Sequence, residues 1–121
     1  MTAGLAATLA NGWLDELTGL FMKAHTGDPG ASGTSNASAE TTRKALSLAA
    51  ASGGSRSANS TLPSWTTWAA GPETITHMSV WDHVSAGNFK YSFALTASKS
   101  VTNGDDLNLT SHSIAVTPIA A

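Results

Sequence analysis

The chain has 121 residues, of which 41% are hydrophobic, and this length suits one compact domain rather than two. Only 12% of the residues are charged and the formal net charge is −2, which excludes the basic surface that nucleic acid or an anionic membrane requires. Cysteine is absent, so disulfides, thiolate metal sites and cysteine nucleophiles are excluded together.

Hydroxyl side chains supply much of the polar surface, because the sequence contains 16 serines and 16 threonines. A hydroxyl group costs less free energy to desolvate than an ammonium or a carboxylate group. The composition therefore favours a protein that lies against other protein copies.

Residues 1–19 predict an N-terminal helix that precedes a β-sandwich domain of residues 20–121. Thr2 can cap this helix and Gly19 can end it. The apolar positions recur at helical spacing: Leu5, Ala6, Leu9, Trp13, Leu14 and Leu17. The last three of them form an apolar edge larger than a small sandwich needs to cover itself, and we expect this edge to contact another protein.

The N-terminal segment does not have the composition of a signal peptide. It lacks a basic start and contains Asp15 and Glu16, so we expect it to be part of the mature structure. No stretch of the sequence approaches the roughly 18 uninterrupted apolar residues of a membrane-spanning helix, and no membrane partner is expected.

From residue 20 onward the apolar residues no longer recur at helical spacing but at every second position. Apolar and polar side chains alternate over residues 20–25 and again over 42–50, and a turn is predicted at 52–55. Further short β segments are predicted at 59–62, 74–82, 89–96, 99–101, 106–109 and 113–117. Regular short strands without βαβ alternation predict an all-β fold: a small antiparallel β-sandwich or barrel with one N-terminal helix.

The aromatic residues fall into two groups. Phe89, Tyr91 and Phe93 alternate with polar or small residues along one strand, which favours a core face over a base-stacking platform. Trp65 and Trp68 flank two threonines and favour core packing or anchoring at a subunit interface. A carbohydrate-facing patch formed with Tyr91 is the alternative.

The stretch KAHTGDPGASGTSNASAETTRKAL, residues 23–46, contains a long connection between two predicted strands. Its glycines do not form a phosphate-binding loop, because the G-x-x-x-x-G-K-[ST] pattern and a following helix are both missing. We expect His25 and Asp28 to hold a turn in which proline fixes φ and glycine supplies the reversal. We also expect the loop to be an ordered arm that contacts a neighbouring subunit.

No cofactor, metal ligand or catalytic residue is predicted. His77 and His83 flank Asp82, but the histidines lack the spacing of a metal-binding helix. The Asn-Gly-Asp-Asp cluster at residues 103–106 is first of all a turn, with weak calcium binding as the alternative. No G-x-S-x-G motif places a serine as a nucleophile.

The order of the motifs along the chain resembles that of small virion structural proteins of tailed bacteriophages, especially phages of actinobacterial hosts. The similarity covers about residues 20–118 and begins with the His-Thr-Gly-Asp-Pro-Gly turn at 25–30. The other matching positions are Thr76, His77, Ser79, Trp81, Leu95, Thr96, Lys99, Val101, Gly104, Asp105 and Leu107. The resemblance implies a structural role in the virion as a decoration or minor tail protein, without enzyme activity.

Composition and resemblance together predict a protein that is made in the host cytoplasm and incorporated into the virion. There it would decorate and stabilise the capsid or tail by binding repeated subunit sites. The expected partners are the major capsid or tail proteins and further copies of the chain, as a trimer or dimer. The alternative is a tail-tip module that binds a saccharide of the host cell surface.

Overall fold

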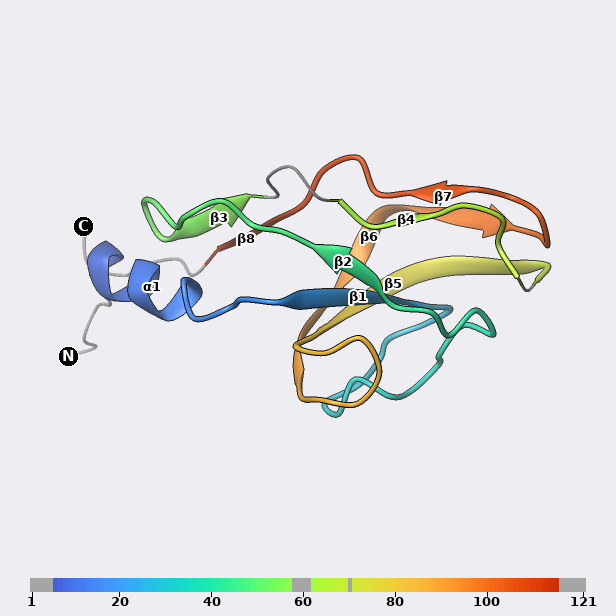
Figure 1. Ribbon diagram of the computed structural model, residues 1–121, viewed down its shortest axis with the longest axis horizontal. Coiled ribbons are helices and arrows are strands. Elements are labelled where there is room, and N and C mark those ends of the chain that lie inside the picture. The colour runs from blue at the N-terminus through green and yellow to red at the C-terminus, as the bar shows by residue number, and fades with distance from the viewer. Residues whose placement is uncertain (1–5, 58–61, 70, 116–121) are drawn as a thin grey trace.

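A four-stranded antiparallel sheet with the strand order β2-β1-β5-β6 forms the centre of the fold (Figure 1). The computed structural model describes residues 6–57, 62–69 and 71–115. The elements are α1 (Ala7–Leu14), β1 (Leu20–His25), β2 (Lys44–Leu46), β3 (Ser55–Ser57), β4 (Ser64–Trp65), β5 (Glu73–Trp81), β6 (Phe89–Val101), β7 (Leu107–Asn108) and β8 (Ser113–Ala115). The described part of the chain is thus mostly β, with antiparallel sheets and one short helix, and the predicted all-β class is confirmed. Within it, no helix is long and apolar enough to cross a membrane.

Strands β1 and β5 form the middle of the core. They pair in antiparallel register from Phe21 opposite Trp81 to His25 opposite His77, which confirms the strands predicted at 20–25 and 74–82. The buried apolar cluster consists of Leu20, Met22, Ala24, Leu46, Trp65, Trp68, Ile75, Met78, Val80, Val101 and Leu107. The strand predicted at 59–62 falls almost wholly outside the described residues, and Leu62 itself lies in no strand.

Strand β6 is one long strand where the sequence pattern predicted two. Ile75 of β5 lies opposite Lys99, but two residues later His77 lies opposite Ala94, so the four residues 95–98 face a single residue of β5. An insertion of this size bends a strand and changes the direction of its side chains. It also interrupts the alternation, which is why the sequence pattern breaks here.

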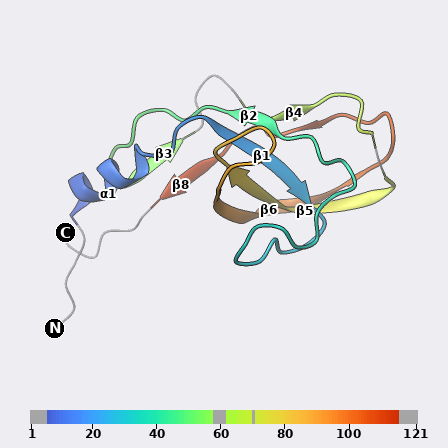
Figure 2. The ribbon, with the colours of Figure 1, turned by 60° about the horizontal axis from the view of Figure 1, so that its bottom comes forward.

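Two short ribbons, β3 with β8 and β4 with β7, lie beside the central sheet (Figures 1 and 2). The second ribbon contains Trp65, which packs edge-on against Trp68 with 6.0 Å between ring centroids. The backbone N–H of Trp68 donates to the carbonyl of Asp105 at 2.6 Å, and its carbonyl accepts from Gly104 at 2.8 Å. The turn predicted at 103–105 therefore exists, and it holds Trp68 in place.

The long loop after β1 closes on itself over residues 26–37. The backbone N–H of Thr26 donates to the carbonyl of Asn36 at 2.9 Å, which joins the two ends of the loop. Within the turn, Asp28 Oδ1 accepts from the backbone N–H of Gly30 at 2.9 Å. The predicted turn is therefore confirmed, and the loop is ordered by its own hydrogen bonds.

Replacing Gly33 in this loop with alanine is expected to lower the free energy of unfolding by about 2–4 kcal/mol. Gly33 has a φ of +73°, and an added Cβ would lie 2.4 Å from the ring of Phe89. Gly53→Ala is the matched control, because Gly53 has a φ of +60° with nothing within 4 Å of an added Cβ. Chemical denaturation of both variants checks the difference, and equal losses would contradict the packing of this loop against β6 (Figure 2).

Candidate interaction surface

Helix α1 lies at one end of the structure (Figures 1 and 2). Two of its large apolar side chains are exposed to solvent. Leu9 and Trp13 are each 64% exposed, and their spacing of four residues places them on one side of the helix. We call these two residues the α1 ridge. Of the predicted apolar edge only Trp13 is exposed, because Leu14 is buried and Leu17 is half-buried against the core.

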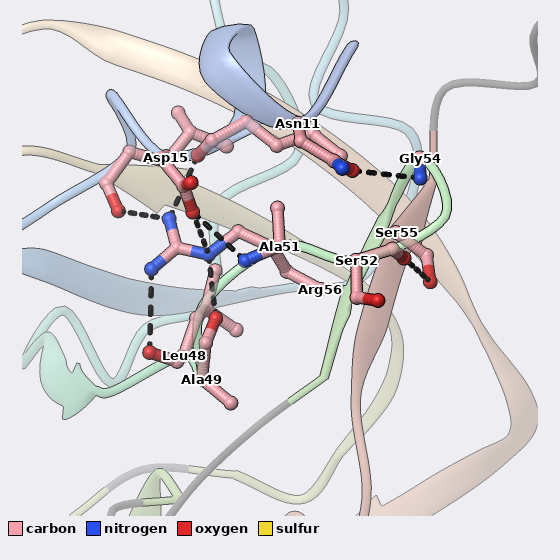
Figure 3. A network of polar contacts seen from close by, with 11 residues as sticks. Asn11, Asp15, Leu48, Ala49, Ala51, Ser52, Gly54, Ser55 and Arg56 are labelled. Atoms are coloured by element: carbon pink, nitrogen blue, oxygen red, sulfur yellow. Dashed lines mark hydrogen bonds and ion pairs between the residues drawn. The ribbon is translucent and has the colours of Figure 1, made fainter. Parts of the chain in front are cut away.

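Arg56 of β3 fixes α1 to the rest of the fold (Figure 3). Although it is charged, Arg56 is only 7% exposed. Its Nη1 donates to the carbonyls of Leu14 and Leu17, both at 2.7 Å, while Nε donates to Ala49 at 2.8 Å and Nη2 to Leu48 at 3.2 Å. Carbonyls at the end of a helix have no partner within the helix, and a cation there also interacts favourably with the helix dipole. We call this arrangement the Arg56 clamp.

Two side chains of the helical segment complete the attachment (Figure 3). Asp15 Oδ1 accepts from the backbone N–H of Ala51 at 2.8 Å and lies 3.6 Å from Nε of Arg56. Asn11 Oδ1 accepts from the backbone N–H of Gly54 at 2.8 Å. Directional polar bonds therefore set the orientation of α1, and they leave the α1 ridge uncovered.

The helix ends earlier than predicted, and the Arg56 clamp lies at its end. It ends at Leu14 instead of Gly19: beyond it, Leu17 bonds to the carbonyl three residues earlier, and the carbonyls of Leu14 and Leu17 accept from Arg56. The predicted cap at Thr2 lies outside the described residues. Nothing in the local pattern indicated the role of Arg56, since a single arginine between serines is typical of an exposed turn.

His25 lies at the end of β1 in a buried hydrogen-bond chain. The carbonyl of Ser35 can only accept, so His25 Nδ1 carries the proton of that 2.8 Å bond, and Nε2 accepts from the hydroxyl of Ser79 at 2.7 Å. The indole N–H of Trp81 donates to the same Ser79 oxygen at 2.8 Å. His25 thus ties the loop of residues 26–37 to β5, in agreement with its predicted role in holding the turn.

The Ser79 and His25 pair has the contact of a nucleophile with a base, but its surroundings do not suit catalysis. Both residues are 0% exposed, so a substrate cannot reach the serine hydroxyl. The second nitrogen of the imidazole bonds a backbone carbonyl instead of a carboxylate. We therefore assign a structural role to the hydrogen bonds between His25 and Ser79.

The stability of the fold is expected to fall as the pH is lowered from 7.5 to 5. Burial lowers the pKa of His25 below its ordinary value of 6.5, and burial also lowers the pKa of His112. The folded state therefore favours the neutral rings, and this stabilisation is complete above pH 6.5 and is lost as the pH falls through the lower pKa. Denaturation at a series of pH values measures the effect.

Two histidine variants test the source of this pH dependence. His25→Gln is expected to be less stable at pH 7.5 and to show a smaller loss between pH 7.5 and 5. His83→Gln is the control, because His83 is exposed, and it should keep the slope of the parent protein. If His25→Gln leaves the pH dependence of the free energy of unfolding unchanged, His25 is not its source.

The predicted surface roles of Trp65 and Trp68 are wrong for the folded chain. Trp65 is 1% exposed and Trp68 is 0% exposed, because both pack into the core under the turn at 103–105. Tyr91 is half-buried, and burial raises its pKa. The saccharide-facing patch predicted from these three residues is therefore not formed.

Two glutamates that the sequence pattern did not single out hold the segments around Trp68. The carboxylate of Glu40 accepts from the backbone N–H groups of Thr42 at 3.1 Å and Ala69 at 3.0 Å. Burial raises the pKa of Glu40, but hydrogen bonds from Thr42 and Ala69 outweigh burial, and the pKa lies below its ordinary value. Glu73 accepts from the Trp68 indole N–H at 3.2 Å. In the part of the chain that the structure describes, no three His, Asp or Glu side chains come together to hold a metal ion.

Comparison with known proteins relates the chain to phage proteins. No curated protein matches the sequence. A family model described as "Podophage GP4 fiber I protein gp80" matches residues 2–117, which is nearly the whole chain. The narrower resemblance to decoration proteins of phages with actinobacterial hosts stays a prediction. The chain belongs to the Podophage GP4 fiber I protein gp80 family, a family of phage structural proteins.

Proposed function

We propose that this chain is a non-enzymatic structural component of the tail or fibre of a tailed phage, and that the α1 ridge attaches it to another virion protein. The observation that carries the proposal is an exposed apolar ridge held rigidly by the Arg56 clamp at one end of the structure. The description of the family names a fibre protein, which favours the tail over the capsid.

The chemistry of the α1 ridge defines the partner surface. Helix α1 has no acidic residue in its first turn and no basic residue in its last, while Glu16 lies exposed two residues after its end. A tryptophan that enters a well-packed pocket and is shielded from water often supplies a large share of the binding energy at an interface. The partner would therefore offer an apolar groove for Leu9 and Trp13, with a basic rim next to Glu16.

Gly12 supports a close approach at this surface. Glycine within a helix costs about 1 kcal/mol relative to alanine, and an added Cβ at Gly12 would meet nothing within 4 Å. Residues 6–57, 62–69 and 71–115 therefore supply no packing reason for glycine at this position. A partner that lies directly against the helix backbone beside the α1 ridge would supply one.

The rigidity of the attachment also favours binding. An ordered ridge loses less conformational entropy on association than a mobile one, so more of the contact energy appears as affinity. A component that binds only the assembled particle stabilises the assembly by mass action. This effect would grow with the number of equivalent sites, and further copies of the chain, as a trimer or dimer, could occupy them.

Immunogold labelling of intact particles tests the proposal. Antibodies raised against the recombinant chain are expected to label the tail or its fibres. Label distributed over the head would instead support capsid decoration. If quantitative mass spectrometry does not detect the chain in purified particles, a role in the virion is contradicted.

A further inference from the structure

The turn of residues 102–106 contains Asn103-Gly104, one of the two Asn-Gly pairs of the chain. Every residue of this turn is exposed, and nothing lies within 4 Å of a Cβ added at Gly104. Asn103 Nδ2 donates to the carbonyl of Ala69 at 3.3 Å, which is long for a hydrogen bond. Solvent therefore reaches the pair, and the side-chain amide of Asn103 is held weakly.

An Asn-Gly pair can lose ammonia without an enzyme, because the backbone nitrogen after the asparagine is a nucleophile once it is deprotonated. Here the nitrogen of Gly104 would lose its proton and bond to Cγ of Asn103, while the bond from Cγ to Nδ2 breaks and ammonia leaves. Water then opens the resulting cyclic imide at either carbonyl and gives aspartate or isoaspartate. The net change is uptake of one water molecule and release of one ammonia molecule. Glycine favours the reaction, since it has no Cβ to hinder the ring.

One hydrogen bond holds the attacking nitrogen in the closed turn. The backbone N–H of Gly104 donates to the carbonyl of Trp68 at 2.8 Å, so the reaction proceeds from a turn that has opened locally. Exposed turns open at a much smaller free-energy cost than core strands and helices. The bond to Trp68 therefore slows the reaction without preventing it.

The second pair, Asn11-Gly12, is protected by its place within α1. Asn11 is half-buried, and its Oδ1 accepts from the backbone N–H of Gly54 at 2.8 Å. Part of the helix would have to unwind before the nitrogen of Gly12 could reach the side chain of Asn11. The other asparagines in the described part of the chain are each followed by a residue with a side chain, which hinders the ring: Asn36, Asn88 and Asn108.

The core around Trp68 depends on the turn that the reaction would change. Trp68 is 0% exposed, and its backbone N–H donates to the carbonyl of Asp105 at 2.6 Å. Isoaspartate at position 103 lengthens the backbone by a methylene group, which displaces Gly104 and Asp105 relative to Trp68. Aspartate instead adds a negative charge beside Asp105 and Asp106, and like charges repel. Both products weaken the two backbone hydrogen bonds that hold Trp68.

We infer that Asn103 is a site of spontaneous deamidation, and that its conversion loosens the core around Trp68. The site is separate from the α1 ridge, and the reaction does not require attachment to the virion. Because no enzyme takes part, the extent of conversion depends on time, temperature and pH.

Peptide mapping by mass spectrometry, after incubation of the folded chain at pH 9 and at pH 6, locates the reaction. Asn103 is expected to deamidate at least about tenfold faster than Asn11, because the turn opens more readily than the helix. The reaction should be faster at pH 9, where more of the Gly104 nitrogen is deprotonated. Asn103→Gln should abolish it at this position, because the longer side chain closes the ring much more slowly.

The same chain unfolded in urea provides the reference. There both Asn-Gly pairs should react at similar rates, since neither is held by the fold. If Asn103 stays intact in the folded chain at pH 9 while it reacts in urea, or if Asn11 reacts as fast as Asn103 in the folded chain, the site is not the one inferred.

Hydrogen exchange of the deamidated protein tests the structural consequence. Ion-exchange chromatography separates this fraction by its added negative charge, and its Trp68 and Gly104 amides should exchange at least about tenfold faster than those of the unmodified protein. The amides of β1 should keep their protection. Asn103→Asp carries the charge without the extra methylene group and should show a smaller increase. Deamidated protein in which Trp68 is protected as in the unmodified chain would overturn the proposal.

Discussion

Replacing Arg56 with methionine is expected to lower the free energy of unfolding by about 3–5 kcal/mol, because four hydrogen bonds to backbone carbonyls are lost at once. Methionine keeps much of the side-chain volume, so the loss reports hydrogen bonding more than packing. Domains of this size have a total stability of about 5–15 kcal/mol, and the expected loss is a large fraction of it. Chemical denaturation at pH 7.5 measures the change.

Two further variants and a hydrogen-exchange measurement show whether the loss of stability comes from the Arg56 clamp. Lys99→Met is the matched control, because Lys99 is exposed, and its stability should change by less than about 0.5 kcal/mol. Arg56→Lys keeps the charge but loses the planar guanidinium group with its several donors. Its loss of stability should lie between those of Lys99→Met and Arg56→Met. Hydrogen exchange should show that the amides of α1 lose protection first in Arg56→Met. Unchanged protection of α1 would show that the helix does not depend on the clamp.

The second large effect concerns assembly instead of folding. Phage particles made with the variant Leu9→Ser, Trp13→Ser are expected to contain at least about tenfold fewer copies of the chain than the parent, since loss of a buried Trp anchor commonly costs 2 kcal/mol or more of binding energy. Both side chains are largely exposed in the free chain, so the free energy of unfolding should change little. Quantitative mass spectrometry of purified particles measures the copy number.

Val84 offers a matched control for this experiment. It is another large apolar side chain that the structure leaves exposed, at 51%, and it lies in the loop between β5 and β6. Val84→Ser should be incorporated like the parent protein. If both variants lose copies equally, the effect is a general one of surface hydrophobicity, and the α1 ridge is not the attachment surface.

The strands in the middle of the sheet could be predicted from the sequence because their pattern is local. Alternation over residues 20–25 follows directly from one buried face, and this strand appears as predicted. The segment predicted at 74–82 appears as β5, whose last four residues are all buried. The single strand β6 was divided in two, because the insertion at 95–98 hides the alternation. The end of α1 was placed too late, and the residue that bonds its last carbonyl, Arg56, lies 42 residues away along the chain.

Among the site residues, too, those held by neighbours in the sequence could be predicted, and those held by distant residues could not. The turn at Asp28 could be predicted, since Asp-Pro-Gly needs only its own neighbours to form. The bond between His25 and Ser79 joins residues 54 positions apart, and only the pairing of β1 with β5 brings them together. For Trp65 and Trp68 the sequence favoured core packing or interface anchoring over a saccharide-facing patch but did not decide between core and interface. Both are buried in the core, and distant contacts such as the bonds between Trp68 and the turn at 103–105 place them there.

Photo-crosslinking from the α1 ridge within assembled particles tests the proposed attachment most directly. With benzoylphenylalanine in place of Trp13, irradiation of intact particles should link the chain to one structural protein of the tail or fibre. The same probe at position 84 should not form this product. Particles that contain the chain but give no crosslink from position 13, or give the same products from both positions, would contradict attachment through α1.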